Sequence, residues 1–368
     1  MKALVIAEKP SVARDIARVL KCGKNINGAI EGERYVVTWG LGHLVELADP
    51  ESYDARYKEW RMEDLPMIPD PFKLEVIKQT GKQYQAVKSQ LHRKDISQVI
   101  IATDAGREGE LVARLILKKA GSRQPIKRLW ISSVTDKAIK EGFASLKDGK
   151  EYESLRDAAL CRAEADWLVG INSTRALTCK YNAQLSCGRV QTPTLAMVCA
   201  RYWENRRFTV EPFWQLHIAA DGGNGDTVKF SSSEKWKEKE PATELYNKVK
   251  EAGTATVTKA ERKEKIEDTP LLYDLTTLQK EANAKHGFTA EQTLEIAQKL
   301  YEKKLITYPR TGSRYIPEDV FVEIPKLLAF IGNLPEWKDK VNPKAVPTRR
   351  SVDGGKVTDH HALLVTGE

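Results

Sequence analysis

The stretch "ALVIAEKPSVARDIARVL", residues 3–20, decides the fold class, because a strand pattern passes directly into a helix pattern. The apolar run 3–7 is typical of a buried strand. Ser11 is the predicted N-cap of the following helix. The apolar residues of that helix recur at the spacing of one face, namely Val12, Ile16, Val19 and Leu20. A strand followed at once by a helix is the repeating unit of α/β folds.

A second stretch, "QVIIATDAGREGELVARLILKKA" (98–120), repeats this order of strand, glycine-containing turn and helix. The alternation through residues 1–150 predicts an α/β domain with a mainly parallel sheet. Glu8 follows the first strand, and Asp104 and Glu108 follow the second. If the two strands are neighbours, these carboxylates meet at the carboxyl edge of the sheet, where α/β folds place their sites.

Carboxylates that lie so close repel one another unless a cation lies among them. Oxygen ligands that leave positions open suit Mg²⁺, which keeps waters and binds phosphate. An alternative for Glu108 and Glu110 is that they are ordinary acids at a helix N-terminus, where the helix dipole favours them. Glu8 stands at the end of a strand, so this alternative does not extend to it.

Beyond residue 150 the pattern changes twice. Residues 150–210 are helical and rich in Arg, Ala and Asp. From 211, apolar and polar residues alternate as in strands, with Trp214, Leu216 and Ile218 on one side. The charged segment 261–268 is predicted to be a solvated connector. Helices return from about 275, and one of them has an apolar face made of Leu294, Ala297, Leu300 and Tyr301.

The 368 residues are enough for two or three domains with cores of their own. The net charge of +8 favours a polyanionic partner, although many soluble proteins without one are as basic. The five cysteines show no CxxC spacing, so the pattern favours neither a zinc ribbon nor a disulfide framework. There is no signal-peptide pattern and no apolar run of membrane-spanning length, so we expect a soluble, cytoplasmic protein.

The stretch "KLITYPRTGSRYIP" (304–317) places Tyr308 between a threonine and a proline. Pro309 disfavours helix at the residue before it, so Tyr308 is expected on a loop from which it can project. A phenol with a pKa of about 10 is ionised in only about one molecule in a thousand at pH 7. Arg310 offers a planar cation that would raise this fraction and neutralise an attacked phosphate. Without such neighbours, a tyrosine is more often a packing residue.

Five motifs, taken in order, resemble those of type IA DNA topoisomerases, and of the topoisomerase III branch in particular: "AEKPSVARDIA", "ATDAGREGE", "RAEADWLVGINSTRALT", "SCGRVQTPTL" and "LYEKKLITYPRTGS". The resemblance runs over essentially the whole chain. It implies an N-terminal Toprim domain that binds Mg²⁺, followed by the helical and β-rich domains of a toroidal enzyme. The expected fold is therefore multidomain, with an α/β part and separate α and β parts.

The resemblance assigns the chemistry of strand breakage to four residues. Tyr308 would attack one DNA strand and keep its 5′-phosphate. Glu8 would protonate the leaving 3′ oxygen, Lys9 would hold the phosphate, and Arg310 would stabilise the charge. Because the phosphotyrosine stores the energy of the broken bond, the reaction needs no ATP, and the sequence contains no GxxxxGK[ST] loop.

The resemblance also implies that Glu8 and Asp104 hold Mg²⁺, with Glu108 contributing. One position departs from the family pattern, since the usual second Asp of an Asp-x-Asp motif is Gly106 here. We therefore expect one bound Mg²⁺ instead of two. On this view, an aspartate at position 106 would leave activity unchanged or raise the affinity for the metal.

A groove for single-stranded DNA is implied along residues 186–191 and at residues near them in the fold. The expected contacts are Trp60, Trp167, Arg175, Ser186, Cys187, Gly188, Arg189, Val190, Gln191 and His360. Polar side chains of this kind bind phosphate and sugar, and an exposed tryptophan stacks on bases. The alternative for each tryptophan is core packing.

The resemblance divides the chain into a Toprim domain (1–147), a helical domain with the DNA groove (148–210), a β-rich arch (211–270) and a helical domain that carries the tyrosine (271–368). In the family the chain returns after the last of these to complete the arch. Because no such return follows here, we expect the arch and the last domain to be incomplete, with open strand edges and exposed apolar surface.

Two other functions remain open. Another Toprim enzyme, such as a primase or a nuclease, would share the N-terminal motifs without needing the tyrosine motif. A catalytically incomplete fragment would only bind single-stranded DNA. For the topoisomerase, the expected partners are single-stranded DNA and negatively supercoiled or recombination-intermediate DNA at the nucleoid. A helicase partner stays open, and no membrane is expected.

Overall fold

The computed structural model describes residues 1–222, 225–254, 256–342, 344–345 and 347–367. The chain divides into two compact units. The first consists of Met1–Arg189 and Thr269–Glu368, and the second is Val190–Asp268. Each unit is described by itself. Among the described residues, no helix combines the length and the apolar character needed to cross a bilayer.

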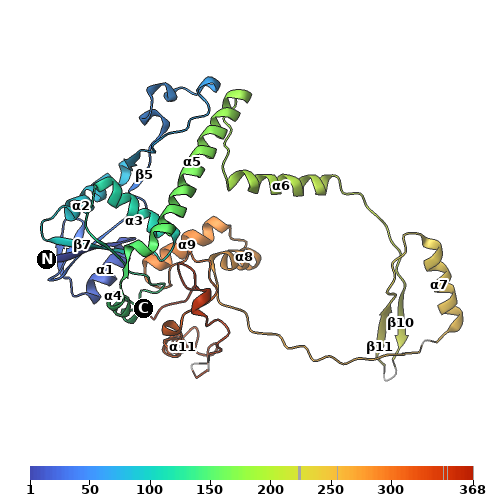
Figure 1. The fold of residues 1–368 in the computed structure, drawn as a ribbon. Helices are drawn as coiled ribbons and strands as arrows, with labels where there is room; N and C mark the ends of the chain where they lie inside the picture. Colours follow the sequence, from blue (N-terminus) through green and yellow to red (C-terminus); the bar gives the residue numbers. More distant parts are fainter. Residues whose placement is uncertain (223–224, 255, 343, 346, 368) are drawn as a thin grey trace. The chain divides into compact units, whose positions relative to one another are not determined.

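A seven-stranded sheet forms the centre of the N-terminal α/β domain (Figure 1). In sheet order its strands are β2 (Lys24–Ile26), β3 (Ala29–Glu31), β4 (Tyr35–Trp39), β1 (Lys2–Ala7), β7 (Ile96–Ala102), β8 (Ile126–Arg128) and β9 (Lys147–Asp148). The four central strands, from β4 to β8, run parallel, and the strands at both edges are antiparallel to their neighbours. The two sequence stretches that predicted parallel strands form β1 and β7, which lie side by side.

Helices cover both faces of this sheet, and this explains why β1 is an unbroken apolar run. They are α1 (Pro10–Val19), α2 (Gly81–Leu91), α3 (Arg107–Ala120) and α4 (Asp136–Ala144). Leu4 and Ile6 of β1 join the core on the side of α2 and α3. The alternate residues of the strand join the core on the side of α1 and α4, which contains Ala3, Val5 and Ala7. The result is a three-layer α/β/α arrangement.

The start of α1 differs from the prediction. The helix begins at Pro10, and its N-cap residue is Lys9, whose side chain makes no capping hydrogen bond. Proline suits the first helical position because it has no N–H to satisfy and its φ is already helical. Ser11 is therefore inside the helix, where its Oγ lies 3.3 Å from the hydroxyl of Tyr301.

The rest of the first unit is mainly helical. A short antiparallel pair, β5 (Val45–Leu47) and β6 (Leu74–Val76), lies near the long helix α5 (Glu153–Tyr181), which packs on α3. The tyrosine-bearing part contains α8 (Leu275–His286), α9 (Ala290–Glu302), α10 (Glu318–Phe321) and α11 (Ile324–Gly332). Its small core is centred on Ile316, Val320 and Ala362.

The second unit contains α6 (Gln191–Arg206), β10 (His217–Asp221), β11 (Thr227–Ser231) and α7 (Lys239–Ala252). Strand structure begins later than predicted, and Trp214 forms only an isolated bridge with Trp236. Among the described residues, β10 and β11 pair only with each other, and Val228 and Phe230 are exposed, in line with the expected open edges. The segment 261–268 is exposed and has no regular structure, as predicted for a connector. The boundaries at 147, 210 and 270 stay predictions, although this unit begins before 210.

Candidate active site

The carboxylates at the ends of β1 and β7 lie together. The register pairs Ala7 with Ala102, so the chain leaves both strands at the same level of the sheet. Glu8 then accepts a hydrogen bond at its Oε2 from the backbone N–H of Asp104, with a distance of 3.3 Å. This is the convergence that neighbouring parallel strands predict.

The two carboxyl groups have opposite pKa shifts. Burial and the negative charge of Asp104 raise the pKa of Glu8 above its ordinary value, against the weaker effects of the Asp104 N–H and Lys9. For Asp104, burial alone would raise the pKa, but the hydrogen bond and charge of His360, with help from Lys9, outweigh burial and lower it. Glu8 therefore keeps its proton to higher pH than an exposed glutamate, while Asp104 is ionised.

A buried arginine holds the turn after β7 in place. Arg128 donates from its guanidinium to the carbonyl oxygens of Thr103 (2.8 Å) and Asp104 (2.6 Å). Its Nε lies 3.0 Å from Oε2 of Glu110, and both side chains are fully buried. A buried ion pair with further hydrogen bonds is costly to break, so it fixes the backbone that carries Asp104. No sequence pattern marks Arg128, because an arginine in a short strand is ordinarily an exposed residue.

Tyr308 lies on a loop, as Pro309 predicts, and this loop is attached to the segment near residue 364. The backbone N–H of Thr307 donates to the carbonyl oxygen of Leu364 at 2.9 Å. The backbone N–H of Leu364 donates in turn to Oγ1 of Thr307, also at 2.9 Å. Thr307, the residue before Tyr308, is therefore bound to Leu364 through both its backbone and its side chain.

Three side chains surround the ring of Tyr308. Nζ of Lys9 lies 3.3 Å from the ring centroid, a cation–π contact. The rings of His360 and Tyr301 have centroids 4.6 Å and 5.2 Å away. Tyr301 was expected only as part of a helical face, so its contact with Tyr308 is new information from the tertiary structure.

Tyr308 is a neutral phenol in this conformation. Burial raises its pKa, and the negative charge of Asp104 raises it further. Arg310 acts in the expected direction, since its charge lowers the pKa of Tyr308, but the other effects outweigh it. The cation close to the ring is Lys9, whereas Arg310 is exposed.

His360 reaches the carboxylate edge from the far end of the sequence. Its Nε2 lies 3.0 Å from Oδ2 of Asp104. Its backbone carbonyl oxygen accepts a hydrogen bond from Oγ1 of Thr311, at 2.8 Å, which ties it to the tyrosine loop. The structure thus brings Glu8, Lys9, Asp104, Tyr308 and His360 into one site.

The donor set at this site fits one hard cation. Mg²⁺ is commonly bound by one or two carboxylates together with waters and substrate phosphate. Glu8 and Asp104 supply two carboxylates whose mutual repulsion a cation would relieve. Glu108 does not join them, because it pairs with Arg162 at 2.6 Å and its side chain is 53% exposed. Across the residues that the structure describes, no three His, Cys, Asp or Glu side chains are grouped closely enough to hold a metal ion.

The residues expected to line a DNA groove lie in different environments. Ser186 and Arg189 are exposed, and the guanidinium of Arg189 pairs with Asp166, with Nη2 and Oδ2 3.2 Å apart. The backbone of Cys187 bonds to Oγ1 of Thr174 through both its N–H (3.0 Å) and its carbonyl oxygen (3.2 Å). Gly188 follows in the same segment, whereas Val190 and Gln191 begin the second unit at α6.

The aromatic groove candidates divide into one exposed and one packed side chain. Trp60 is 45% exposed, which leaves a face open to a base. Arg175 lies beneath it, with its guanidinium 5.0 Å from the ring and only 4% of the residue exposed, so in this conformation Arg175 supports Trp60 and does not face solvent. Trp167 packs edge-on against Phe72 and donates its indole N–H to the carbonyl oxygen of Ala48 at 3.0 Å. For Trp167 the geometry therefore favours core packing over stacking on a base.

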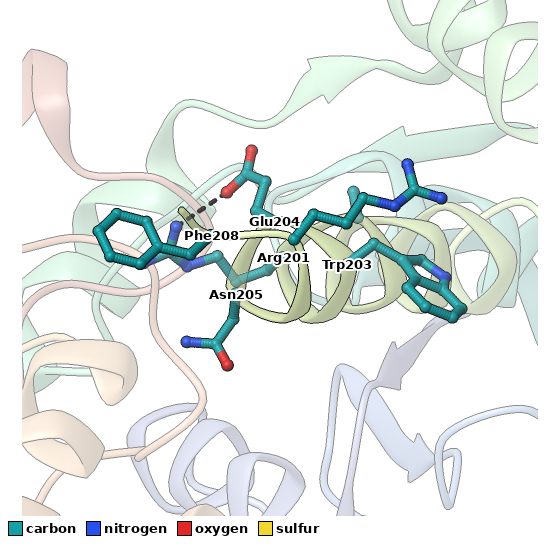
Figure 2. A pocket seen from close by; sticks show the side chains of 7 residues that line it. Arg201, Trp203, Glu204, Asn205 and Phe208 are labelled. Atoms are coloured by element: carbon teal, nitrogen blue, oxygen red, sulfur yellow. Dashed lines mark hydrogen bonds and ion pairs between the residues drawn. The ribbon is translucent and has the colours of Figure 1, made fainter. Parts of the chain in front are cut away.

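Figure 2 shows a surface pocket in the second unit, around the end of α6. Its lining residues are Ala200, Arg201, Trp203, Glu204, Asn205, Arg207 and Phe208. Arg201 and Glu204 pair with each other at 2.8 Å across one turn of the helix. The pocket contains none of the expected catalytic residues, which all belong to the first unit.

Carboxylates at the strand ends of an α/β domain face a loop-borne tyrosine, an arrangement whose groups suit phosphoryl transfer. Residues 3–134 match the family model of the Toprim domain, and residues 150–368 match the model described as DNA topoisomerase. The chain belongs to the DNA topoisomerase family. The resemblance inferred from the five motifs is confirmed.

Relatives extend well beyond this chain in length. DNA topoisomerase 3 of Bacillus cereus is 53% identical over 377 residues, which cover 99% of this chain and 51% of the relative. DNA topoisomerase 3 of Bacillus subtilis is 52% identical over 371 residues, which cover 100% of this chain and 51% of the relative. The chain therefore spans about half the length of the curated relatives it matches.

Among solved structures, full-length topoisomerase I from Thermotoga maritima is similar, with a TM-score of 0.61 and 23% identity. The match covers 99% of this chain and 55% of that chain. At this identity the similarity shows the fold alone.

Proposed function

We propose that this chain carries the strand-breaking centre of a type IA topoisomerase of the topoisomerase III kind, which breaks and rejoins single-stranded DNA without ATP. The observation that carries the proposal is the position of Tyr308. Its ring lies 3.3 Å from Nζ of Lys9 and next to His360, which pairs with Asp104. The proposed nucleophile therefore lies beside the proposed phosphate-binding cation, and the two come from distant parts of the chain.

In the proposed reaction, Oη of Tyr308 attacks the phosphorus and the bond from phosphorus to the 3′ oxygen breaks. The phenol proton passes to solvent water and Glu8 gives its proton to the 3′ oxygen, so the step releases one proton to solvent and leaves Glu8 ionised. Glu8 is the proposed donor, since burial and the charge of Asp104 raise its pKa and so let it keep its proton to higher pH than an exposed glutamate would. Lys9 moves from the ring to the phosphate when DNA binds, and Arg310 adds positive charge to the transition state. Rejoining reverses these transfers.

Mg²⁺ is the proposed cofactor, held by Glu8 and Asp104, and it would supply positive charge to orient the DNA phosphates. Glu108 joins this set only if it leaves Arg162, with which it pairs at 2.6 Å. One ion is the proposed number, because position 106 offers no carboxylate.

Single-stranded DNA is the proposed substrate. Ser186, Cys187, Gly188, Arg189, Val190 and Gln191 form the proposed phosphate-binding segment. Trp60 is the proposed base-stacking residue, and Arg175 holds it from below. Trp167 has a packing role in this scheme, and His360 acts at the scissile phosphate. The substrates of the whole enzyme would include negatively supercoiled and recombination-intermediate DNA in the nucleoid, where a helicase is a further candidate partner.

The decisive experiment is incubation of the chain with a labelled single-stranded oligonucleotide and Mg²⁺, followed by denaturation. A covalent protein–DNA adduct with DNA attached through its 5′-phosphate is expected. Binding without an adduct would favour the DNA-binding fragment. Free cleavage products, with no protein attached, would favour a Toprim nuclease.

A further inference from the structure

Gly106 lies two residues after Asp104, and its backbone conformation does not explain why glycine occupies this position. It is the N-cap residue of α3, with φ −159° and ψ 176°. This is extended backbone that any residue adopts, so the position does not need glycine for its conformation. The size of a side chain at position 106 is therefore limited by the space around the residue and not by its backbone.

That space is filled by a carboxylate from the C-terminal segment. A Cβ atom at position 106 would overlap with Oδ1 of Asp359 and would lie 2.7 Å from its Cγ and 3.0 Å from its Oδ2. Atoms at these distances overlap, so any side chain at 106 would displace the Asp359 carboxylate. The carboxylate of Asp359, an exposed residue, thus lies in the hole that the absent side chain leaves at Gly106.

The segment that carries Asp359 is firmly attached to the tyrosine loop. Oγ of Ser313 donates to the carbonyl oxygen of Lys356 at 2.9 Å, and Oγ1 of Thr311 donates to that of His360 at 2.8 Å. The backbone N–H of Ala362 donates to the carbonyl oxygen of Tyr315 at 2.8 Å. These bonds, with those between Thr307 and Leu364, make the loop and the segment one body that moves together.

We propose that Asp359 and Gly106 form a knob-and-hole contact that sets the register of Tyr308 against Glu8 and Lys9. Asp359 is a positioning residue, since it acts by seating the tyrosine-bearing body on the Toprim domain. His360, the next residue, then meets Asp104 at 3.0 Å. The effect of this contact on catalysis rests on the proposed function, whereas the existence of the contact does not.

The contact changes one expectation from the sequence. An aspartate at position 106 was expected to be tolerated or to improve metal binding. In the structure its side chain would overlap with Asp359 and place two carboxylates in one space, so the variant is expected to be impaired.

The test compares Gly106→Ala and Gly106→Asp with Gly81→Ala in the full 368-residue chain. Gly81 is a matched control because it has helical backbone (φ −54°) and no atom within 4 Å of a built Cβ. We expect Gly106→Ala to slow adduct formation by roughly 10- to 100-fold, as for other small misplacements of reacting groups, with an unchanged Kd for the oligonucleotide. Gly81→Ala should behave as the wild type.

A rescue variant and a second readout distinguish positioning from general damage. The double variant Gly106→Ala/Asp359→Gly removes the overlap between the two side chains, so its adduct rate should rise to that of Asp359→Gly alone. Hydrogen exchange of the Asp104 amide, which bonds to Glu8 in a residue that pairs with His360, should be faster by about tenfold in Gly106→Ala than in the wild type and should recover in the double variant.

Gly106→Ala that exchanges and cleaves like Gly81→Ala would overturn the contact. A double variant no better than Gly106→Ala would overturn it as well. If the wild type forms no adduct, the proposed function fails, but the exchange measurement still decides the contact.

Discussion

Tyr308, the proposed nucleophile, has surroundings that would keep its phenol neutral before DNA binds. Burial and the charge of Asp104 raise the pKa of its phenol, and the ring is covered by Lys9 at 3.3 Å. A phosphate is a stronger ligand for an ammonium group than an aromatic face is, so bound DNA would draw Lys9 away and bring positive charge to the reacting oxygen. In the proposed reaction, ionisation of the Tyr308 phenol and binding of DNA are thus linked through Lys9.

Tyr308→Phe should bind single-stranded DNA with nearly the wild-type Kd and form no covalent adduct. The substitution removes only the nucleophilic oxygen and keeps the ring that packs between Lys9 and His360. Binding by fluorescence anisotropy and adduct formation on a denaturing gel measure the two properties separately. Tyr315→Phe is the control, because Tyr315 lies on the same loop outside the site and should leave the adduct yield unchanged. An adduct in Tyr308→Phe would refute the assignment.

Glu8 should make the stability of the metal-free protein fall as pH rises. Its pKa in the folded state lies above the ordinary value of 4.5, so between these two values the folded chain binds more protons than the unfolded chain. The contribution is complete below pH 4.5 and is lost as pH rises through the folded pKa. Glu8→Gln cannot ionise, so its Tm in EDTA should equal that of the wild type at low pH and exceed it at pH 8. Equal Tm values at both pH values would contradict the shift.

At the scale of elements, the turn after β7 depends on a strand that sits beside it. Arg128, at the end of β8, reaches across to the carbonyl oxygens of Thr103 and Asp104 and pairs with Glu110 in α3. One side chain therefore joins a strand, a turn and a helix. The carboxylate edge is rigid because this arginine satisfies backbone groups that the end of β7 leaves unpaired.

Arg128→Ala should lower the free energy of unfolding by about 3–5 kcal/mol, the usual cost of leaving a buried charge without its partner. Arg162→Ala is the matched control, since it removes an arginine from an exposed pair with Glu108 and should cost at most about 1 kcal/mol. Urea denaturation followed by circular dichroism measures both. Similar losses of unfolding free energy in the two variants would show that the buried pair stabilises the protein no more than the exposed pair does.

At the scale of the whole molecule, the two units are joined by exposed chain. Residues 256–268 form neither helix nor strand and are exposed throughout. Four cations in this segment are sites for trypsin: Lys259, Arg262, Lys263 and Lys265. The first cuts in limited proteolysis should therefore fall here, because cleavage needs a segment that can extend into the protease. Mass spectrometry of the early fragments identifies the sites, and first cuts within residues 1–147 would contradict the prediction.

Binding to single-stranded DNA should weaken steeply with salt. The chain has a net charge of +8, and each phosphate that it neutralises should add about −0.7 to the slope of log binding constant against log salt. Arg189→Ala should reduce the magnitude of this slope by about 0.7 if Arg189 exchanges Asp166 for a phosphate. Arg18→Ala is the control, because Arg18 pairs with Asp136 on the helical face of the α/β domain, away from the expected groove. A binding constant independent of salt would argue against the groove.

The sequence by itself determined the α/β domain and most members of the site. β1 and β7 were predictable because both faces of the sheet are covered, which demands unbroken apolar runs, and a parallel pair puts Glu8 and Asp104 at one edge. Tyr308 was predictable as a loop residue because Pro309 restricts the backbone before it. These features leave a local mark in the sequence: an apolar run indicates a strand that is buried on both faces, and a proline restricts the residue before it.

Only the tertiary structure decided which residues support that site. Arg128, Tyr301 and Asp359 act across long separations in sequence, so no spacing or periodicity in the chain marks them. The same holds for Gly106. Its backbone conformation does not require glycine, and the absence of a side chain matters only because Asp359 lies in that space in the folded chain. It also holds for the charge state of Tyr308, because a pKa depends on burial and on nearby charges, and these exist only after the distant parts of the chain have packed together.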